Sequence, residues 1–257
     1  MTRLKWFLID VAILLAIWAA VSAWVPSAHY VLPSIPVVAH ELVELVASGE
    51  LVRHIVASLT RTAEGFLLAV ITALPLGLLL GSAPRLLRMV EPLIEMIRPI
   101  SPIAWIPLSI LWFGIGEASK IFIIWLIAFF FILLNTIVGV TSVDRRLIEA
   151  ARTLGASRTF LWRKVLLWAA VPHILVGMRL GLAVSIGGVL IAEMIAANSG
   201  IGFLMERSRV VLNPAPVIVG MLVIALLGYA ANRLLVIVET VLMRHRVSVS
   251  FESSSNS

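Results

Sequence analysis

Long apolar runs separated by short polar segments dominate this chain. A helix that spans a membrane needs about 20 mostly apolar residues. Six runs reach that length, and we expect each to form a transmembrane helix: Trp6–Trp24, Ile55–Gly81, Leu93–Phe113, Ile121–Val143, Val165–Ala197 and Pro216–Met243. The second and fifth runs are too long for a simple span, so we expect them to tilt or to extend beyond the lipid. The predicted fold class is an all-α polytopic membrane protein with six transmembrane helices.

Composition supports the bilayer as the solvent of this chain. Its 257 residues are 61% hydrophobic and 13% charged, whereas a soluble domain carries roughly 25% charged residues. The chain has no cysteine, which excludes disulfides and thiolate metal sites. The net charge of +6 does not indicate a nucleic-acid site, because the basic residues recur in short clusters between apolar runs.

These clusters predict the orientation of the chain. If the N-terminus is cytoplasmic, the inner segments hold 13 basic residues and the outer segments hold 5. The inner residues are Arg3, Lys5, Arg85, Arg88, Arg98, Arg145, Arg146, Arg152, Arg158, Arg163, Lys164, Arg244 and Arg246; the outer ones are Arg53, Arg61, Lys120, Arg207 and Arg209. Basic residues favour the cytoplasmic side, so we expect both termini in the cytoplasm.

The ends of the chain allow two further interpretations. The first apolar run follows Arg3 and Lys5 and precedes Ser27-Ala28, as in a cleaved signal peptide. Its length and the charge of Asp10 favour a full span instead. The serine-rich tail, from about residue 248 to 257, is expected to be disordered. No linker divides the chain, so residues 1–257 are expected to form a single transmembrane domain.

The segment from residue 144 to 164 has more structure than a connector needs. Asp144 can cap a helix whose apolar stripe holds Leu147, Ile148, Ala151 and Leu154. Gly155 suits the left-handed position after the helix, and Ser157 can cap a second helix. Such an amphipathic helix could lie on the anionic leaflet, or it could dock on another protein.

The order of residues in this segment resembles the E-A-A loop of binding-protein-dependent ABC importer permeases. The matching positions are Glu149-Ala150-Ala151, Gly155, Val165 and Leu167. The family pattern ends in proline where this chain has Trp168, and Pro172 follows one turn later. Two further blocks, Pro99–Lys120 and Ala192–Leu204, resemble the third and fifth spans of permeases for taurine, alkanesulfonates, nitrate and bicarbonate.

This resemblance implies a MetI-like importer permease core that works as a dimer with two ATPase subunits and an extracytoplasmic binding protein. The loop would dock on the ATPase and transmit its motion to the spans. The implied coupling residues are Glu149, Ala150, Ala151, Arg152, Gly155 and Arg158. The alternative for Ala151 is packing against the chain's own spans.

Energy must then come from a partner, because the sequence contains no phosphate-binding G-x-x-x-x-G-K-[ST] loop. ATP would be bound by the ATPase subunits, with no cofactor in this chain. Catalysis within the chain is not expected either. The segment from His40 to Glu44 starts like a zinc motif but lacks the second histidine, and no nucleophile–base pair stands out.

Prolines and charges within the spans are candidates for the translocation path. Pro102 and Pro107 each remove a backbone donor and are expected to kink the third span. Trp105, between them, could wall the path or pack against a neighbouring helix. Arg179 could attract an anion or pair with a neighbouring helix or the second copy, and Glu193 is a further charge in the same span.

The implied substrate is a small oxyanion, with an alkanesulfonate or taurine first and nitrate or bicarbonate next. One alternative is the same type of importer carrying a pyrimidine-type vitamin precursor. Another is an ion-coupled secondary carrier, which would also lack an ATPase motif.

Overall fold

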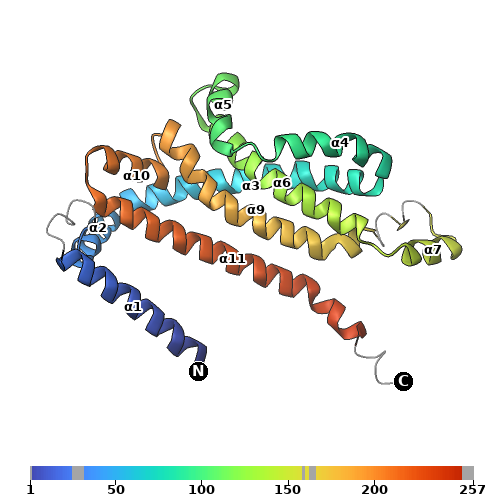
Figure 1. The fold of residues 1–257 in the computed structure, drawn as a ribbon, viewed down its shortest axis with the longest axis horizontal. Coiled ribbons are helices and arrows are strands. Elements are labelled where there is room, and N and C mark those ends of the chain that lie inside the picture. The colour runs from blue at the N-terminus through green and yellow to red at the C-terminus, as the bar shows by residue number, and fades with distance from the viewer. Residues whose placement is uncertain (1, 25–31, 158–159, 162–165, 251–257) are drawn as a thin grey trace. The chain divides into compact units, whose positions relative to one another are not determined.

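The computed structural model describes residues 2–24, 32–157, 160–161 and 166–250, and these form helices joined by turns, without a strand among them. The predicted all-α class is confirmed. In chain order the helices are α1 (Thr2–Trp24), α2 (Ile35–Ala47), α3 (Glu50–Ser82), α4 (Pro84–Ile97), η2 (Pro102–Trp105), α5 (Ile106–Phe113), α6 (Glu117–Thr141), α7 (Arg145–Thr153), α9 (Leu167–Ala196), α10 (Ile201–Val210) and α11 (Pro214–Ser250) (Figure 1).

The chain divides into two compact units. The first consists of Met1–Leu59 and Glu193–Leu226, and the second of Thr60–Ala192 and Leu227–Ser257. The helices α3, α9 and α11 each pass from one unit into the other.

Four of the described helices are long and apolar enough to cross a membrane: Glu50–Ser82, Glu117–Thr141, Leu167–Ile195 and Pro214–Thr240. They correspond to the second, fourth, fifth and sixth predicted spans. Helix α1 covers the first predicted span. Helix α11 continues to Ser250, so the tail predicted from about residue 248 overlaps its end, and residues 251–257 lie outside the described part of the chain.

The third predicted span, Leu93–Phe113, is not one kinked helix but two pieces bent by 91°. Helix α4 ends at Ile97 and the next piece begins at Pro102. Ser101 is extended, with ψ at 136°, because a proline disfavours the helical conformation of the residue before it. Pro107 lies in the first turn of α5, where its missing N–H breaks no helical bond, so the expected kink there is absent. If the bent pair counts as one broken span, the described residues contain five.

The core of the second unit depends on close approach between α3 and α6. A Cβ atom at Gly77 would lie 2.6 Å from the Thr136 Cβ, and one at Gly81 would lie 2.7 Å from the Val140 Cβ. Small residues at such positions let two helix backbones pack closely, and the resulting van der Waals contact is one of the forces that associate helices in lipid. Buried apolar side chains of both helices fill the space beside this contact: Phe66, Ala69, Ala73, Leu80, Ala128, Ile132, Leu133 and Ile137.

In the first unit, α10 packs against the start of α11. A Cβ atom at Gly220 of α11 would lie 2.6 Å from the Met205 Cγ of α10. Ile201 and Leu204 of α10 and Val219 of α11 are at most 4% exposed. The N-terminal turns of α3 contribute the buried Leu51 to the same unit.

Candidate functional site

Helix α7 begins where the sequence predicts it. The Arg146 N–H donates a hydrogen bond of 2.9 Å to Asp144 Oδ1. The carboxylate thus satisfies one of the amide groups that a first helical turn leaves free, and its charge suits the positive end of the helix dipole.

The end of α7 also has the predicted geometry. Gly155 has a φ of +79°, and the Ala156 N–H donates a 3.0 Å hydrogen bond to the Ala151 carbonyl. A left-handed residue followed by this long-range bond is the Schellman closure of a helix. Two residues later, Ser157 Oγ accepts the Phe160 N–H at 3.2 Å. Both predicted caps around Gly155 are confirmed.

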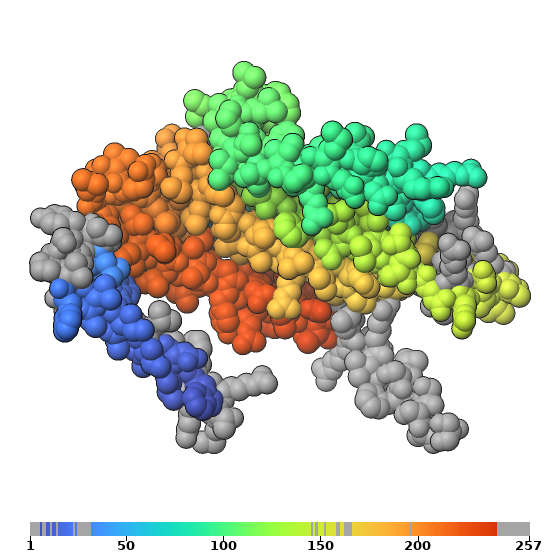
Figure 2. Space-filling view, in the orientation of Figure 1, coloured from blue at the N-terminus to red at the C-terminus, as the bar shows by residue number. Residues whose placement is uncertain are grey.

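The surface of α7 is open in the single chain. Glu149 and Ala150 are exposed, Ala151 is half-buried, and Leu154 is 88% exposed. The yellow-green atoms of α7 are visible at the surface in Figure 2. Leu154, the last residue of the predicted apolar stripe, is therefore not packed against the rest of the chain. Arg158 lies outside the described residues, as do the side chains of Leu147, Ile148 and Arg152.

A cavity of about 510 Å³ lies in the second unit beside the bend between α4 and η2. Its wall is mainly apolar, with one cationic side chain, Arg98, and one amide, Asn135, in the described lining. Asn135 Nδ2 donates to the Phe131 carbonyl at 2.8 Å. The other lining residues are Ile100, Pro102, Trp105, Leu126, Ile127, Phe130, Phe131, Leu134, Val138 and Leu180.

The five residues predicted for the translocation path separate in the structure. Pro102 and Trp105 line the cavity, and its lining does not include Pro107, Arg179 or Glu193. Arg179 Nε donates a 2.7 Å hydrogen bond to Asn232 Oδ1 of α11, which matches the pairing alternative. Glu193 belongs to the first unit, where its side chain is 1% exposed.

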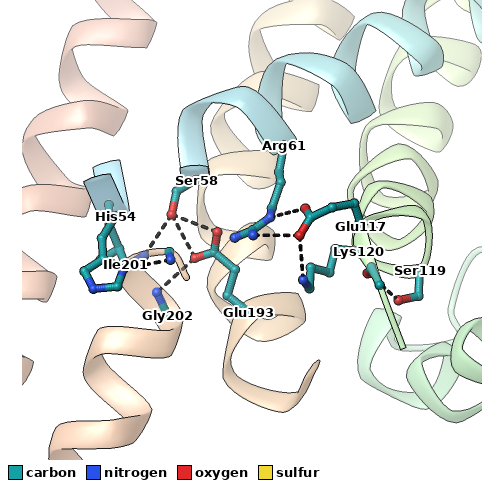
Figure 3. Close-up of polar contacts among 11 residues, drawn as sticks. His54, Ser58, Arg61, Glu117, Ser119, Lys120, Glu193, Ile201 and Gly202 are labelled. Carbon is teal, nitrogen blue, oxygen red and sulfur yellow. Dashed lines mark hydrogen bonds and ion pairs between the residues drawn. The ribbon is translucent and has the colours of Figure 1, made fainter. Parts of the chain in front are cut away.

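Sequence reasoning missed the partners of Glu193. Ser58 Oγ donates to both carboxylate oxygens at 2.8 Å, and the Gly202 N–H donates to Oε2 at 3.0 Å (Figure 3). His54, one turn before Ser58 on α3, accepts the Gly200 N–H at Nδ1. Two polar residues four positions apart on one face of an apolar helix were the available signal.

A second polar cluster in the second unit was also missed. Arg61 of α3 and Lys120 of α6 are both buried, and both donate to the Glu117 carboxylate, with Arg61 Nη2 and Lys120 Nζ each 2.9 Å from Oε1 (Figure 3). Glu117 stands in the first turn of α6, where a carboxylate also suits the helix dipole. Among the described residues no group of three histidine, aspartate or glutamate side chains could hold a metal ion.

Comparison with known proteins identifies the family of this chain. Residues 73–243 match the family described as the binding-protein-dependent transport system inner membrane component. The taurine transport system permease protein TauC of Escherichia coli is 36% identical over 223 residues, covering 85% of this chain and 81% of that protein. The putative aliphatic sulfonates transport permease protein SsuC of Bacillus subtilis is 35% identical over 241 residues, covering 92% of this chain and 86% of that protein.

The fold has a solved counterpart. A chain of the MetNI methionine ABC transporter, in an inward-facing conformation, matches with a TM-score of 0.61 and 22% identity over 74% of this chain and 96% of that chain. The family match and the two permease relatives carry the assignment further than the fold. The chain belongs to the binding-protein-dependent permease family and is a multi-pass inner-membrane permease subunit of an ABC importer.

Proposed function

We propose that this permease forms the translocation path for a sulfonate, either taurine or an alkanesulfonate. The cavity beside the α4–η2 bend carries this proposal, because its apolar wall holds one cationic side chain, Arg98, and one amide, Asn135. A sulfonate joins a permanently charged group with three acceptor oxygens to an organic part. Arg98 offers charge-assisted hydrogen bonds to the charged group, and the apolar wall suits the methylene groups of the organic part. Nitrate and bicarbonate lack an organic part and rank after the sulfonates.

Transport would be driven through α7. Glu149, Ala150, Ala151, Arg152, Gly155 and Arg158 would meet a separate ATPase subunit, and the open surface and two caps of this segment support that role. ATP binding would close the ATPases, move α7 with them and open a permease dimer outward. Hydrolysis would then reset the dimer inward. An extracytoplasmic binding protein would deliver the substrate, and the chain would work in the lipid with both termini in the cytoplasm.

Uptake by the reconstituted importer tests the substrate. Proteoliposomes would contain this permease, its ATPase and its binding protein, and would be offered labelled taurine, nitrate and a pyrimidine vitamin precursor in parallel. We expect ATP-dependent uptake of taurine, and we expect Arg98→Gln to lower it. Arg85→Gln is the matched control, because Arg85 lies in the first turn of α4, at the other end of the helix from Arg98, and does not line the cavity. If the importer takes up the pyrimidine precursor but not taurine, the oxyanion assignment is wrong.

A further inference from the structure

Three consecutive backbone N–H groups at the start of α10 find their acceptors on side chains of other helices. Gly200 donates to His54 Nδ1 at 2.9 Å, Ile201 donates to Ser58 Oγ at 2.9 Å, and Gly202 donates to Glu193 Oε2 at 3.0 Å (Figure 3). Because the first N–H groups of a helix lack partners within it, a buried helix start needs such acceptors. The start of α10 is therefore held jointly by α3 and α9.

Glu193 is the charged member of this joint. It lies in the last turn of α9, and the Ser58 hydroxyl bridges both of its carboxylate oxygens at 2.8 Å. Its side chain is 1% exposed, and a buried carboxylate is tolerated only where hydrogen bonds replace water. The dipole of α10 adds attraction, because the positive end of a helix favours a negative charge.

The turn between α9 and α10 is fitted to this carboxylate. Gly200 has a φ of +116°, and a Cβ atom at this position would overlap the carboxylate of Glu193. The absence of a side chain at residue 200 lets the backbone approach Glu193 closely enough for the Gly202 N–H to reach it.

We propose that Glu193 is a positioning residue of the transport cycle, which makes α10 move as one piece with the last turn of α9. The proposal rests on the proposed coupling function, because α9 begins at Leu167, directly after the coupling segment of residues 144–164. Helix α9 is continuous over 30 residues, with one proline, Pro172, inside its N-terminal part, so a displacement that enters after Pro172 would reach the last turn along a single helix. The joint at Glu193 passes that displacement to α10.

This role differs from contact with the substrate. The Glu193 oxygens accept hydrogen bonds from α3 and α10. A carboxylate lining the path of an oxyanion would repel it, so its neutralisation would change the KM for the substrate. Neutralisation of a positioning residue lowers the maximal rate instead and loosens α10.

The test uses Glu193→Gln in the complete importer. Glutamine keeps the length of the side chain, but it removes the charge and replaces one acceptor oxygen with a donor, so a single neutral oxygen is left to accept the Ser58 and Gly202 hydrogen bonds. The matched control is Glu206→Gln on α10, whose carboxylate accepts the Arg209 Nε at 2.9 Å on the surface; this hydrogen bond lowers the pKa of Glu206. The chain has no cysteine, so cysteines introduced at the exposed Ile195 and Val210 can carry spin labels without background.

Three quantities are measured in proteoliposomes with ATPase and binding protein: recovery of the complex, taurine uptake, and the distribution of distances between the labels with and without ATP. Glu193→Gln should assemble normally, lower the maximal uptake rate about 10- to 100-fold at an unchanged KM, and broaden the distances. Ser58→Ala should act in the same direction more weakly, and Glu206→Gln should change none of the three.

The alternatives give different results. A changed KM with unaltered distances would mean that Glu193 contacts the substrate, and the proposal would be wrong. Wild-type uptake and distances in Glu193→Gln would also overturn it. If that variant does not assemble, unaltered distances in Ser58→Ala would overturn it. If the wild type takes up no taurine, the proposed substrate fails, while the label distances, which need no substrate, still decide the role of Glu193.

Discussion

Arg179 in α9 donates a hydrogen bond of 2.7 Å to the side-chain oxygen of Asn232 in α11. A charge within a membrane span is costly and usually pairs inside the helix bundle. The sequence left open whether Arg179 attracts an anion or pairs with a neighbouring helix, and the observed bond joins two span helices of the second unit. The residue thus has a packing role that needs no substrate.

A double-mutant cycle measures this pair. Arg179→Met and Asn232→Leu should each destabilise the permease, and their combination should cost less than the sum, with a coupling of about 0.6–1.7 kcal/mol. Unfolding of the purified permease in detergent would be followed for all four proteins. Arg233→Met is the control, because Arg233 donates to Tyr229 of its own helix at 2.9 Å. A second cycle combines Arg179→Met with Arg233→Met. If its coupling is as large as that of the Arg179–Asn232 cycle, the pairing of Arg179 with Asn232 is contradicted.

The parts of the fold that the sequence predicts well are those set by neighbours in the chain. Asp144, Gly155 and Ser157 act on residues within five positions, so their caps follow from local chemistry. The apolar runs place the long helices for the same reason. The family match also removes the alternative of an ion-coupled carrier, which the runs alone left open.

Contacts between residues far apart in the sequence could not be predicted from local patterns. Ser58 and Glu193 are 135 positions apart, and Arg61 and Glu117 are 56 apart. Nothing in either local sequence names the partner, because the pairing depends on which helix faces pack together. The 91° bend has a similar origin: the prolines predict an interruption near Pro102, but its angle depends on the extended Ser101 and on packing.

The glycine at position 200 allows a matched comparison with Gly49. Both have positive φ, at +116° and +73°, but a Cβ atom meets nothing within 4 Å at Gly49 and overlaps the Glu193 carboxylate at Gly200. Gly49→Ala should therefore cost only the backbone strain, about 1–2 kcal/mol. Gly200→Ala should cost at least about 1 kcal/mol more, because its φ of +116° with ψ of 164° is essentially restricted to glycine and because the added Cβ disturbs a buried hydrogen-bonded carboxylate. Thermal unfolding of the two variants would measure the difference, and equal losses would mean that the close approach to Glu193 carries no energy.

The orientation of the chain can be tested at two exposed leucines. Leu154, after α7, and Leu212, after α10, are 88% and 82% exposed. Their segments lie on opposite sides of the membrane in the topology predicted from the basic residues. A membrane-impermeant maleimide added to intact spheroplasts should label Leu212→Cys, and it should label Leu154→Cys only after the membrane is opened. The cysteine-free parent is the blank. The reverse pattern would invert the topology and remove α7 from the ATPase side.

Gly155 offers the sharpest test of coupling, because a substitution there changes the backbone strain at a φ of +79° without creating a steric clash. A Cβ atom there meets nothing within 4 Å, so a substitution acts through the backbone alone. Valine strains a left-handed backbone, while asparagine tolerates it. Gly155→Val should lose about 1–2 kcal/mol in the turn and tilt α7 away from its partner. Gly155→Asn should behave nearly as the wild type.

Membrane insertion, ATPase pull-down and uptake would be measured side by side for both variants. Insertion should be normal in each, since no span is altered, and Gly155→Val should weaken ATPase association and transport together. Gly187→Val is a control for the added side chain, because Gly187 of α9 has open space and no positive φ. If Gly155→Asn loses transport as severely as Gly155→Val, the added side chain and not the backbone strain is the cause. Normal association and uptake in Gly155→Val would show that this turn does not position the coupling helix.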